Sequence, residues 1–246
     1  MALAKDILNT FLTWVNQSSV SDTPASGRSL LYFKTDGNLY KKDSGGTESR
    51  VGGDSGVPWY GNATITAPPA VSGFTWVNQG SATATEANST IELYGPTSAG
   101  TDLHILKKSK TGTYTITMLM KYSLLSNWIQ TGFVWRESSS GKLVTYGPNY
   151  DNGLLLPVCK WNSATSVLSY YTAPAMPTGY PFWFRIQVDS TNRICSYSVD
   201  GKYFANVHSV SKTDYITADE VGFYIGQQSN SSQQGTSLII SWLEGA

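Results

Sequence analysis

Apolar and polar positions follow three different patterns along the 246 residues. In the first pattern, Ala4, Ile7, Phe11 and Trp14 recur at a spacing of three to four residues, which predicts an amphipathic helix over residues 2–16. A helix of about two heptads is marginal by itself in water. We therefore expect its apolar face to pack, either on sister helices or another protein or on the chain's own β domain, and we favour the first alternative.

The second pattern consists of two short β-prone runs, residues 30–34 and 38–42, on either side of Asp36-Gly37. Glycine adopts the positive φ of a tight turn at little cost, so this pair predicts a β-hairpin. Two strands alone are marginally stable, which indicates a need for partner chains. We expect the apolar side chains of the helix and hairpin to mediate oligomerisation: Ile7, Phe11, Trp14, Leu31, Phe33 and Leu39.

The third pattern begins after residues 43–58, a Gly- and Ser-rich segment typical of a linker. From about Trp59 onward, short runs rich in Thr, Val, Ile, Tyr and Trp alternate with turn residues, which predicts many β-strands in a two-sheet sandwich or jelly roll. The expected strands cover residues 75–78, 90–93, 103–107, 114–122, 132–137, 143–146, 154–160, 167–171, 182–189, 194–199, 202–207, 221–225 and 238–242. We thus expect three parts: a helix in residues 1–20, a hairpin with its linker in residues 21–58, and a sandwich in residues 59–246.

Composition narrows the choice of partners. Seventeen basic and seventeen acidic residues give a formal net charge of zero, without the basic stripe typical of nucleic-acid-binding proteins. We interpret the one basic cluster, Lys107, Lys108 and Lys110, as a solvated loop. No apolar stretch approaches the ~20 residues that span a bilayer, and residues 1–17 do not have the pattern of a signal peptide. We expect no nucleic-acid partner, no membrane insertion and synthesis in the cytoplasm without secretion.

The residue types that carry catalysis or bind metals do not form a recognisable pattern. Cys159 and Cys195 have no metal-ligand spacing and are expected to be small buried hydrophobes. Glycoside hydrolysis uses a pair of carboxylates, but Glu137 stands alone and Asp219-Glu220 are adjacent, so they would face opposite ways in a strand. We expect no enzyme activity, no catalytic residue, no cofactor and no metal site. Calcium would find its best local oxygen cluster at Asn149, Asp151 and Asn152, where we favour a plain loop.

Residues 24–53 resemble a recurrent module of tailed-phage fibre and virion proteins. The matching positions are Pro24, Gly27, Leu31-Tyr32-Phe33-Lys34, Asp36-Gly37, Leu39-Tyr40 and Gly45-Gly46. In such proteins the module sits near the virion-proximal end, commonly in a trimer. The resemblance therefore implies a virion location, a homotrimer and attachment to other virion proteins.

Residues 181–207 resemble a stretch found in concanavalin-like β-sandwich domains, including laminin-G-like and related carbohydrate-associated modules. The match rests on Trp183 and Arg185 in a W-x-R-I run, and on Tyr197-Ser198 and Asp200-Gly201 in the hairpin that follows. Residues 132–142 and the final SLIISWLEGA fit the same domain type, and residues 74–85 resemble openings of such domains in phage structural proteins. The implied fold is mainly β: a concanavalin-like jelly-roll sandwich preceded by a short N-terminal helix and a β-hairpin.

Aromatic and polar side chains between residues 135 and 161 predict a carbohydrate site. Sugar sites combine aromatic faces with a few polar groups on a shallow platform. For Trp135 and Trp183, which lie inside strands, we favour core packing, whereas Tyr150 and Trp161 lie in loop-like contexts and could serve either role. The predicted carbohydrate-binding residues are Trp135, Arg136, Tyr146, Tyr150, Asp151, Asn152 and Trp161.

Three functions follow from these observations. The first is a virion fibre or spike protein that assembles through its N-terminal part and binds host-surface glycans through its sandwich. The second is a structural decoration of a capsid or tail without a dedicated ligand. The third, which we favour least, is an enzyme that degrades polysaccharides with an unrecognised carboxylate pair.

Overall fold

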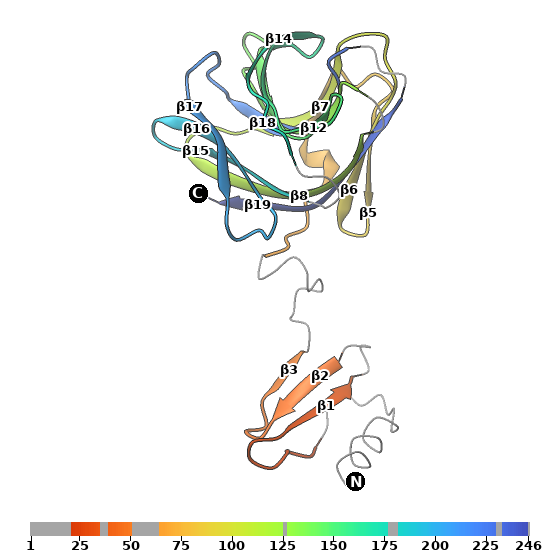
Figure 1. The fold of residues 1–246 in the computed structure, drawn as a ribbon, viewed down its shortest axis with the longest axis vertical. Coiled ribbons are helices and arrows are strands. Elements are labelled where there is room, and N and C mark those ends of the chain that lie inside the picture. The colour runs from red at the N-terminus through yellow and green to blue at the C-terminus, as the bar shows by residue number, and fades with distance from the viewer. Residues whose placement is uncertain are drawn as a thin grey trace. The chain divides into compact units, whose positions relative to one another are not determined.

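The computed structural model of the chain describes residues 21–34, 39–50, 64–124, 127–176, 182–229 and 233–245. Contacts within the chain cluster into two units, residues 1–61 and 62–246 (Figure 1). The helix expected over residues 2–16, with Ile7, Phe11 and Trp14, lies outside the described residues, and so does the Asp36-Gly37 turn. Within the described segments, no helix has the length and apolar character needed to cross a membrane.

The first unit contains a three-stranded antiparallel sheet in the order β1 (Ser29–Phe33), β2 (Leu39–Asp43) and β3 (Glu48–Arg50). The predicted pairing of the first two strands is confirmed, with Tyr32 opposite Tyr40. The third strand was not predicted. It follows a turn in which the Asp43 carboxylate accepts hydrogen bonds from the backbone N–H groups of Gly45 and Thr47, both at 2.9 Å.

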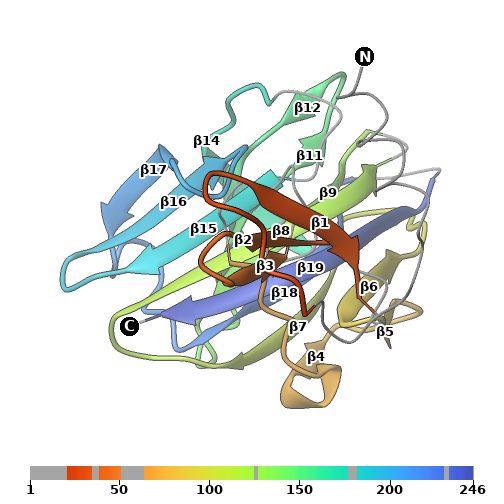
Figure 2. The ribbon, with the colours of Figure 1, turned by 90° about the horizontal axis from the view of Figure 1, so that it is seen from below.

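The second unit is a sandwich of two antiparallel sheets, which confirms the predicted mainly-β, concanavalin-like jelly-roll class. The front sheet runs in the order β14 (Ser166–Thr172), β13 (Val158–Ser163), β10 (Leu143–Tyr146), β9 (Ile129–Arg136), β18 (Glu220–Gln227), β7 (Asp102–Ser109) and β4 (Thr75–Val77), and β11 (Asn149–Tyr150) joins it beside β9 and pairs with β12 (Leu154–Leu155). The back sheet runs in the order β17 (Ala205–Ser211), β16 (Asn192–Ser198), β15 (Phe182–Val188), β8 (Tyr114–Leu124), β19 (Gly235–Gly245), β6 (Thr90–Gly95) and β5 (Thr83–Ala87), as Figure 2 shows.

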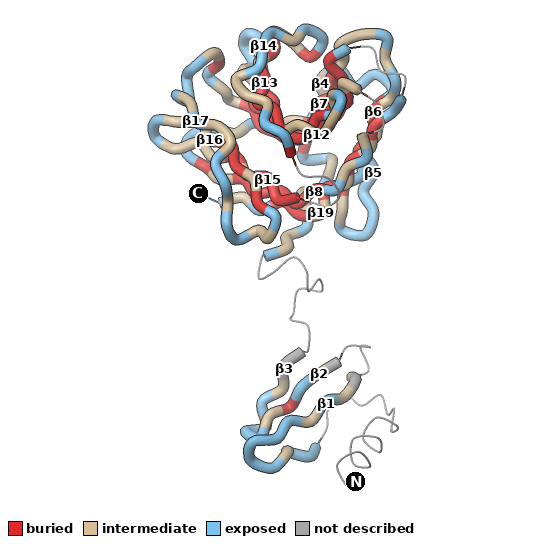
Figure 3. The backbone as a smooth tube through the Cα atoms, viewed as in Figure 1, coloured by how far each residue is buried: buried red, intermediate tan, exposed pale blue. Residues whose placement is uncertain are grey.

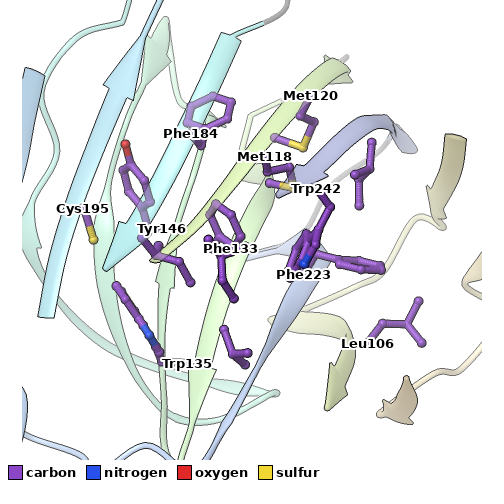
Figure 4. Close-up of a cluster of buried hydrophobic side chains, with 14 of the residues drawn as sticks. Leu106, Met118, Met120, Phe133, Trp135, Tyr146, Phe184, Cys195, Phe223 and Trp242 are labelled. Atoms are coloured by element: carbon purple, nitrogen blue, oxygen red, sulfur yellow. The ribbon is translucent and has the colours of Figure 1, made fainter. Parts of the chain in front are cut away.

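The main core lies between the two sheets, where alternate residues of each strand point inward. Phe223 of the front sheet and Trp242 of the back sheet lie with their ring centroids 5.7 Å apart, and Phe133 lies 5.3 Å from the same indole (Figure 4). The indole N–H of Trp135 donates to the hydroxyl of Tyr114 at 3.0 Å. Each large ring therefore bridges the sheets, and burial concentrates on the facing strands (Figure 3).

The front sheet also buries its other face, because it curls on itself. The backbone N–H of Leu103 in β7 donates to the carbonyl of Ala164, in the turn between β13 and β14, at 2.9 Å. Within this sheet, β18 and β7 approach closely: a Cβ on Gly222 would lie 1.8 Å from the Leu106 carbonyl oxygen. The curl encloses a second apolar cluster: Leu103, Ile105, Val134, Leu143, Cys159, Trp161, Ala164 and Tyr224.

Several local predictions need correction. The single strand expected over residues 154–160 is two strands, because Pro157 has no N–H to donate to a ladder. The strand expected over residues 202–207 begins at Ala205, since the Asp200 carboxylate first caps a turn by accepting the N–H groups of Lys202 and Tyr203. Two strands, β5 and β11, were not predicted, because the first is polar and the second has only two residues.

The cysteine prediction is confirmed and the lysine prediction is wrong. Cys159 and Cys195 are free thiols, both buried. Lys107, Lys108 and Lys110 do not form a solvated loop: the first two belong to β7, and all three pair with carboxylates, Lys107 with Glu220 and the other two with Glu244.

Candidate functional site

Three of the predicted sugar-binding rings are packing residues. Trp135 and Tyr146, 1% and 0% exposed, point into the core between the sheets. Trp161 is 0% exposed and lies in β13 rather than in a loop, where its indole N–H donates to the Thr145 hydroxyl at 2.8 Å. Burial of all three rings contradicts direct contact with a sugar. The loop-like context predicted for Trp161 is wrong because the curl of the front sheet buries this face of β13, and the local sequence gives no sign of that burial.

Arg136 lies away from the other predicted contacts. Its guanidinium donates to Glu220 at 2.5 Å, and the other Glu220 oxygen accepts from the Lys107 ammonium at 2.7 Å. Along β9, Arg136 is six residues from Gln130, the residue opposite Asn149 in β11. At about 3.3 Å per residue this places Arg136 roughly 20 Å from the Tyr150 end of the sheet. Arg136 is therefore part of a structural ion-pair group.

Tyr150, Asp151 and Asn152 remain together at one end of the front sheet. The side-chain amides of Asn127 and Asn152 meet at 3.2 Å, and the backbone N–H of Asn152 donates to the Asn127 side-chain oxygen at 3.1 Å. The backbone N–H of Trp128 donates to the carbonyl of Tyr150 at 2.6 Å. These bonds hold the 127–128 and 150–152 segments side by side.

Trp128 occupies an unusual backbone conformation in this pair of segments. Its φ is 72°, in the left-handed region that L-residues with large side chains rarely adopt. Such strain costs on the order of 1–3 kcal/mol and persists only where neighbouring contacts impose it. The contacts to Tyr150 and, on the other side, to Gln228 supply that restraint.

Tyr170 and Gln228 extend the same surface. The backbone N–H of Gln228 donates to the Trp128 carbonyl at 3.0 Å, and the Tyr170 hydroxyl donates to the Gln228 side-chain oxygen. Burial of the hydroxyl raises the pKa of Tyr170 to about 12, so it stays protonated at neutral pH. The Tyr150 and Tyr170 side chains are 37% and 40% exposed. We call this group the tyrosine–amide surface: Asn127, Trp128, Tyr150, Asp151, Asn152, Tyr170 and Gln228.

Polar groups continue from this surface into the curled sheet. The Tyr224 hydroxyl donates to the Gln130 side-chain oxygen at 3.1 Å, and Asn149 lies opposite Gln130 across the β9–β11 pair. Both amides are 0% exposed, and the Asn149 amide has no hydrogen-bond partner among the protein groups described. A run of hydroxyl and amide groups therefore lines this end of the front sheet from its surface to its interior.

The surface offers hydrogen bonding and aromatic contact rather than metal ligation. Asp151 is its one carboxylate, and the Asn152 amide donates to it at 3.2 Å. In the described part of the chain, no three His, Cys, Asp or Glu side chains approach one another as metal ligands. Sequence reasoning missed Asn127, Trp128, Tyr170 and Gln228 because they lie on segments far apart in sequence. The available signal was weak: an Asn-Trp pair between the strands expected over residues 114–122 and 132–137.

No protein-family model matches this sequence, and no curated protein sequence matches it. Among solved structures, a functionally unknown protein from Saccharomyces cerevisiae is similar at 16% identity, with a TM-score of 0.57 over 72% of this chain and 98% of that chain. A mutant of the GH43 protein BlXynB from Bacillus licheniformis is similar at 13% identity, with a TM-score of 0.56 over 96% of this chain and 56% of that chain. These two likenesses show a shared β-sandwich fold.

Proposed function

We propose that the chain is a virion fibre or spike protein whose sandwich binds host-surface carbohydrate at the tyrosine–amide surface, without cleaving it. The observation that carries this proposal is the grouping of two exposed tyrosines with the side-chain amides of Asn127 and Asn152, above the buried amide of Gln228, in one hydrogen-bonded group. Aromatic faces contact the apolar side of a sugar ring, while amides and hydroxyls bind its hydroxyl groups.

Binding without cleavage is supported by the distribution of carboxylates. Hydrolysis of a glycosidic bond commonly needs two carboxyl groups across the bond, and the tyrosine–amide surface provides Asp151 alone. Glu220 uses both oxygens in ion pairs with Lys107 and Arg136, and Glu244 likewise pairs with Lys108 and Lys110. In our proposal these two acids stabilise the fold through their ion pairs.

Assembly through the N-terminal part rests on two observations. Residues 24–53 resemble the phage fibre module, and the sheet β1-β2-β3 leaves Leu31 49% exposed. Of the residues between 21 and 50 whose side chains are described, only Lys42 is buried. Several copies held together would convert weak single sites into tight attachment, provided that the geometry lets them engage at once.

A glycan array probed with the full chain, displayed multivalently, tests the carbohydrate site. We expect saccharide-competable binding that falls at least about tenfold in Tyr150→Ala and Tyr170→Ala, because each ring contributes a stacking contact. Tyr203→Ala is the matched control, since Tyr203 is 72% exposed in the turn between β16 and β17. If the chain binds no bacterial polysaccharide, or if all three variants lose binding equally, a structural decoration is favoured instead.

A further inference from the structure

A second group of aromatic and cationic side chains lies where β14 and β17, the edge strands of the two sheets, come into contact. The Lys160 ammonium lies 4.4 Å from the ring centroid of Tyr171 and 5.8 Å from that of Tyr215. The Lys142 ammonium lies 5.2 Å from the Tyr215 centroid. All four side chains are partly exposed, and we call them the lysine–tyrosine cluster.

The two lysines differ from the ion-paired lysines of β7. Within the described residues, neither Lys142 nor Lys160 has a carboxylate within 4.0 Å. Glu137, the acid nearest in sequence to Lys142, accepts instead from the Ser140 hydroxyl at 2.5 Å and the Thr217 backbone N–H at 2.8 Å. The positive charge of the cluster therefore faces solvent without a direct counter-ion.

A buried arginine lies behind the cluster. Arg193 is 2% exposed, and one terminal nitrogen donates to the Asp214 carbonyl at 2.5 Å, while the other two guanidinium nitrogens have no hydrogen-bond partner of normal geometry among the described residues. The Asp214 carboxylate accepts the Tyr171 hydroxyl rather than pairing with Arg193. A cation in such a low-dielectric position acts over a longer range than one in water.

The remaining titratable group facing the cluster does not offset this charge. The His208 ring centroid lies 4.6 Å from that of Tyr171, and no described group forms a hydrogen bond with its Nε2. Burial and the nearby Arg193 cation lower the pKa of His208, so it is neutral at pH 7. The cluster and the groups facing it therefore contain two acids, Asp214 and Glu137, and three cations: Lys142, Lys160 and Arg193.

We propose that the lysine–tyrosine cluster is a second binding site, specific for an acidic saccharide. The carboxylate or sulfate of the sugar binds Lys142 and Lys160, and its ring lies against Tyr215, whose backbone is held at a φ of 65°. Aromatic faces beside cations suit a charged sugar ring. A nucleic acid is typically bound by a longer basic stripe, and the sequence has no such run of basic residues.

This site is separate from the tyrosine–amide surface, although the two adjoin the same strand. Consecutive strand residues point to opposite sides, and accordingly Tyr170 contacts Gln228 while Tyr171 contacts His208 and Asp214. Binding at one of these sites therefore does not depend on binding at the other.

Calorimetric titration of the full chain with two acidic probes tests the proposal: an oligogalacturonate and a sulfated dextran oligomer. The methyl-esterified galacturonate and unsulfated dextran are the neutral counterparts. We expect at least one acidic probe to bind, and to bind at least about tenfold more tightly than its neutral counterpart. Binding should weaken as salt rises from about 50 mM to about 500 mM, because screening shortens the reach of the charges.

Matched variants locate the site. We expect the double variant Lys142→Gln/Lys160→Gln to weaken binding about five- to tenfold, since two partly exposed ion contacts are lost. Lys202→Gln, at an exposed lysine in the β16–β17 turn, should leave it unchanged. Absence of binding by both acidic probes, equal binding of a neutral counterpart, or an unaffected double variant would overturn the proposal. Tighter binding of a short DNA duplex, lost in the same double variant, would overturn it in favour of a nucleic-acid site.

Discussion

Trp161 and Tyr150 are both large aromatic residues in loop-like sequence contexts, yet they have different roles. The Trp161 ring is fully enclosed and its one polar atom bonds to Thr145, so the side chain is satisfied by the fold itself. Tyr150 keeps 37% of its surface exposed, next to the hydrogen-bonded pair Asn127 and Asn152. Exposure decides which of the two rings is free to contact a sugar.

Glu244 is a residue at which stability depends on pH. Burial opposes its ionisation, but hydrogen bonds from Lys108, Trp242 and Lys110 outweigh that cost and lower its pKa to about 2. An unfolded chain binds the proton near pH 4.5, so this residue stabilises the fold above about pH 5, and the contribution is lost as pH falls toward about 2. We expect Glu244→Gln to cost on the order of 2 kcal/mol at pH 7 and almost nothing at about pH 2.

Urea denaturation followed by tryptophan fluorescence at several pH values measures this difference. Glu92→Gln is the control, because Glu92 is exposed on β6 and has no ion pair within the described residues. A Glu244→Gln penalty of equal size at both ends of the pH range would contradict the assignment.

At the scale of strands, Gly222 controls how closely β18 and β7 approach. We expect Gly222→Ala to destabilise the sandwich by about 1–3 kcal/mol or more, because the added Cβ would meet the Leu106 carbonyl, a backbone atom that cannot swing away. Thermal unfolding measures the change. Gly73→Ala is the matched control, since a Cβ there meets nothing within 4 Å and φ is not in the left-handed region. Similar melting temperatures for the two variants would show that the sheet relaxes.

Strands were predictable to the extent that they are rich in apolar and aromatic residues. Tyr114–Leu124 and Phe182–Val188 have that composition, and their positions agree closely with expectation. The third strand of the first unit, Glu48–Arg50, is polar throughout and gave no such signal. Strand polarity is therefore what separates the predicted elements from the missed ones.

The candidate site was predictable only where its residues are neighbours in sequence. Tyr150, Asp151 and Asn152 were identified together and remain together. Tyr170 and Gln228 reach the same surface because the front sheet curls, which brings the start of β9, the end of β18 and the edge strand β14 to one end. That curvature joins segments far apart in the sequence, and no pattern of side chains within one strand predicts it.

At the scale of the whole molecule, we expect the first unit to determine the oligomeric state. Light scattering should find the full chain as a trimer and a chain of residues 62–246 as a folded monomer, because the second unit has its own two-sheet core. Leu31→Glu places a charge at an exposed position of β1 and should weaken association without unfolding the sandwich. A truncated chain that remains trimeric would move the interface to the sandwich.

The position of β19 has a consequence for folding during synthesis. This strand, residues 235–245, lies in the middle of the back sheet, between β8 and β6. During synthesis, β5 and β6 leave the ribosome long before β19 does. They are joined to β8 in the back sheet only through β19, so this part of the sheet forms only after residues 235–245 have left the ribosome. The two halves of the back sheet are thus joined only after residues 235–245 have been made, and a chain that stops before residue 235 lacks the strand that lies between them.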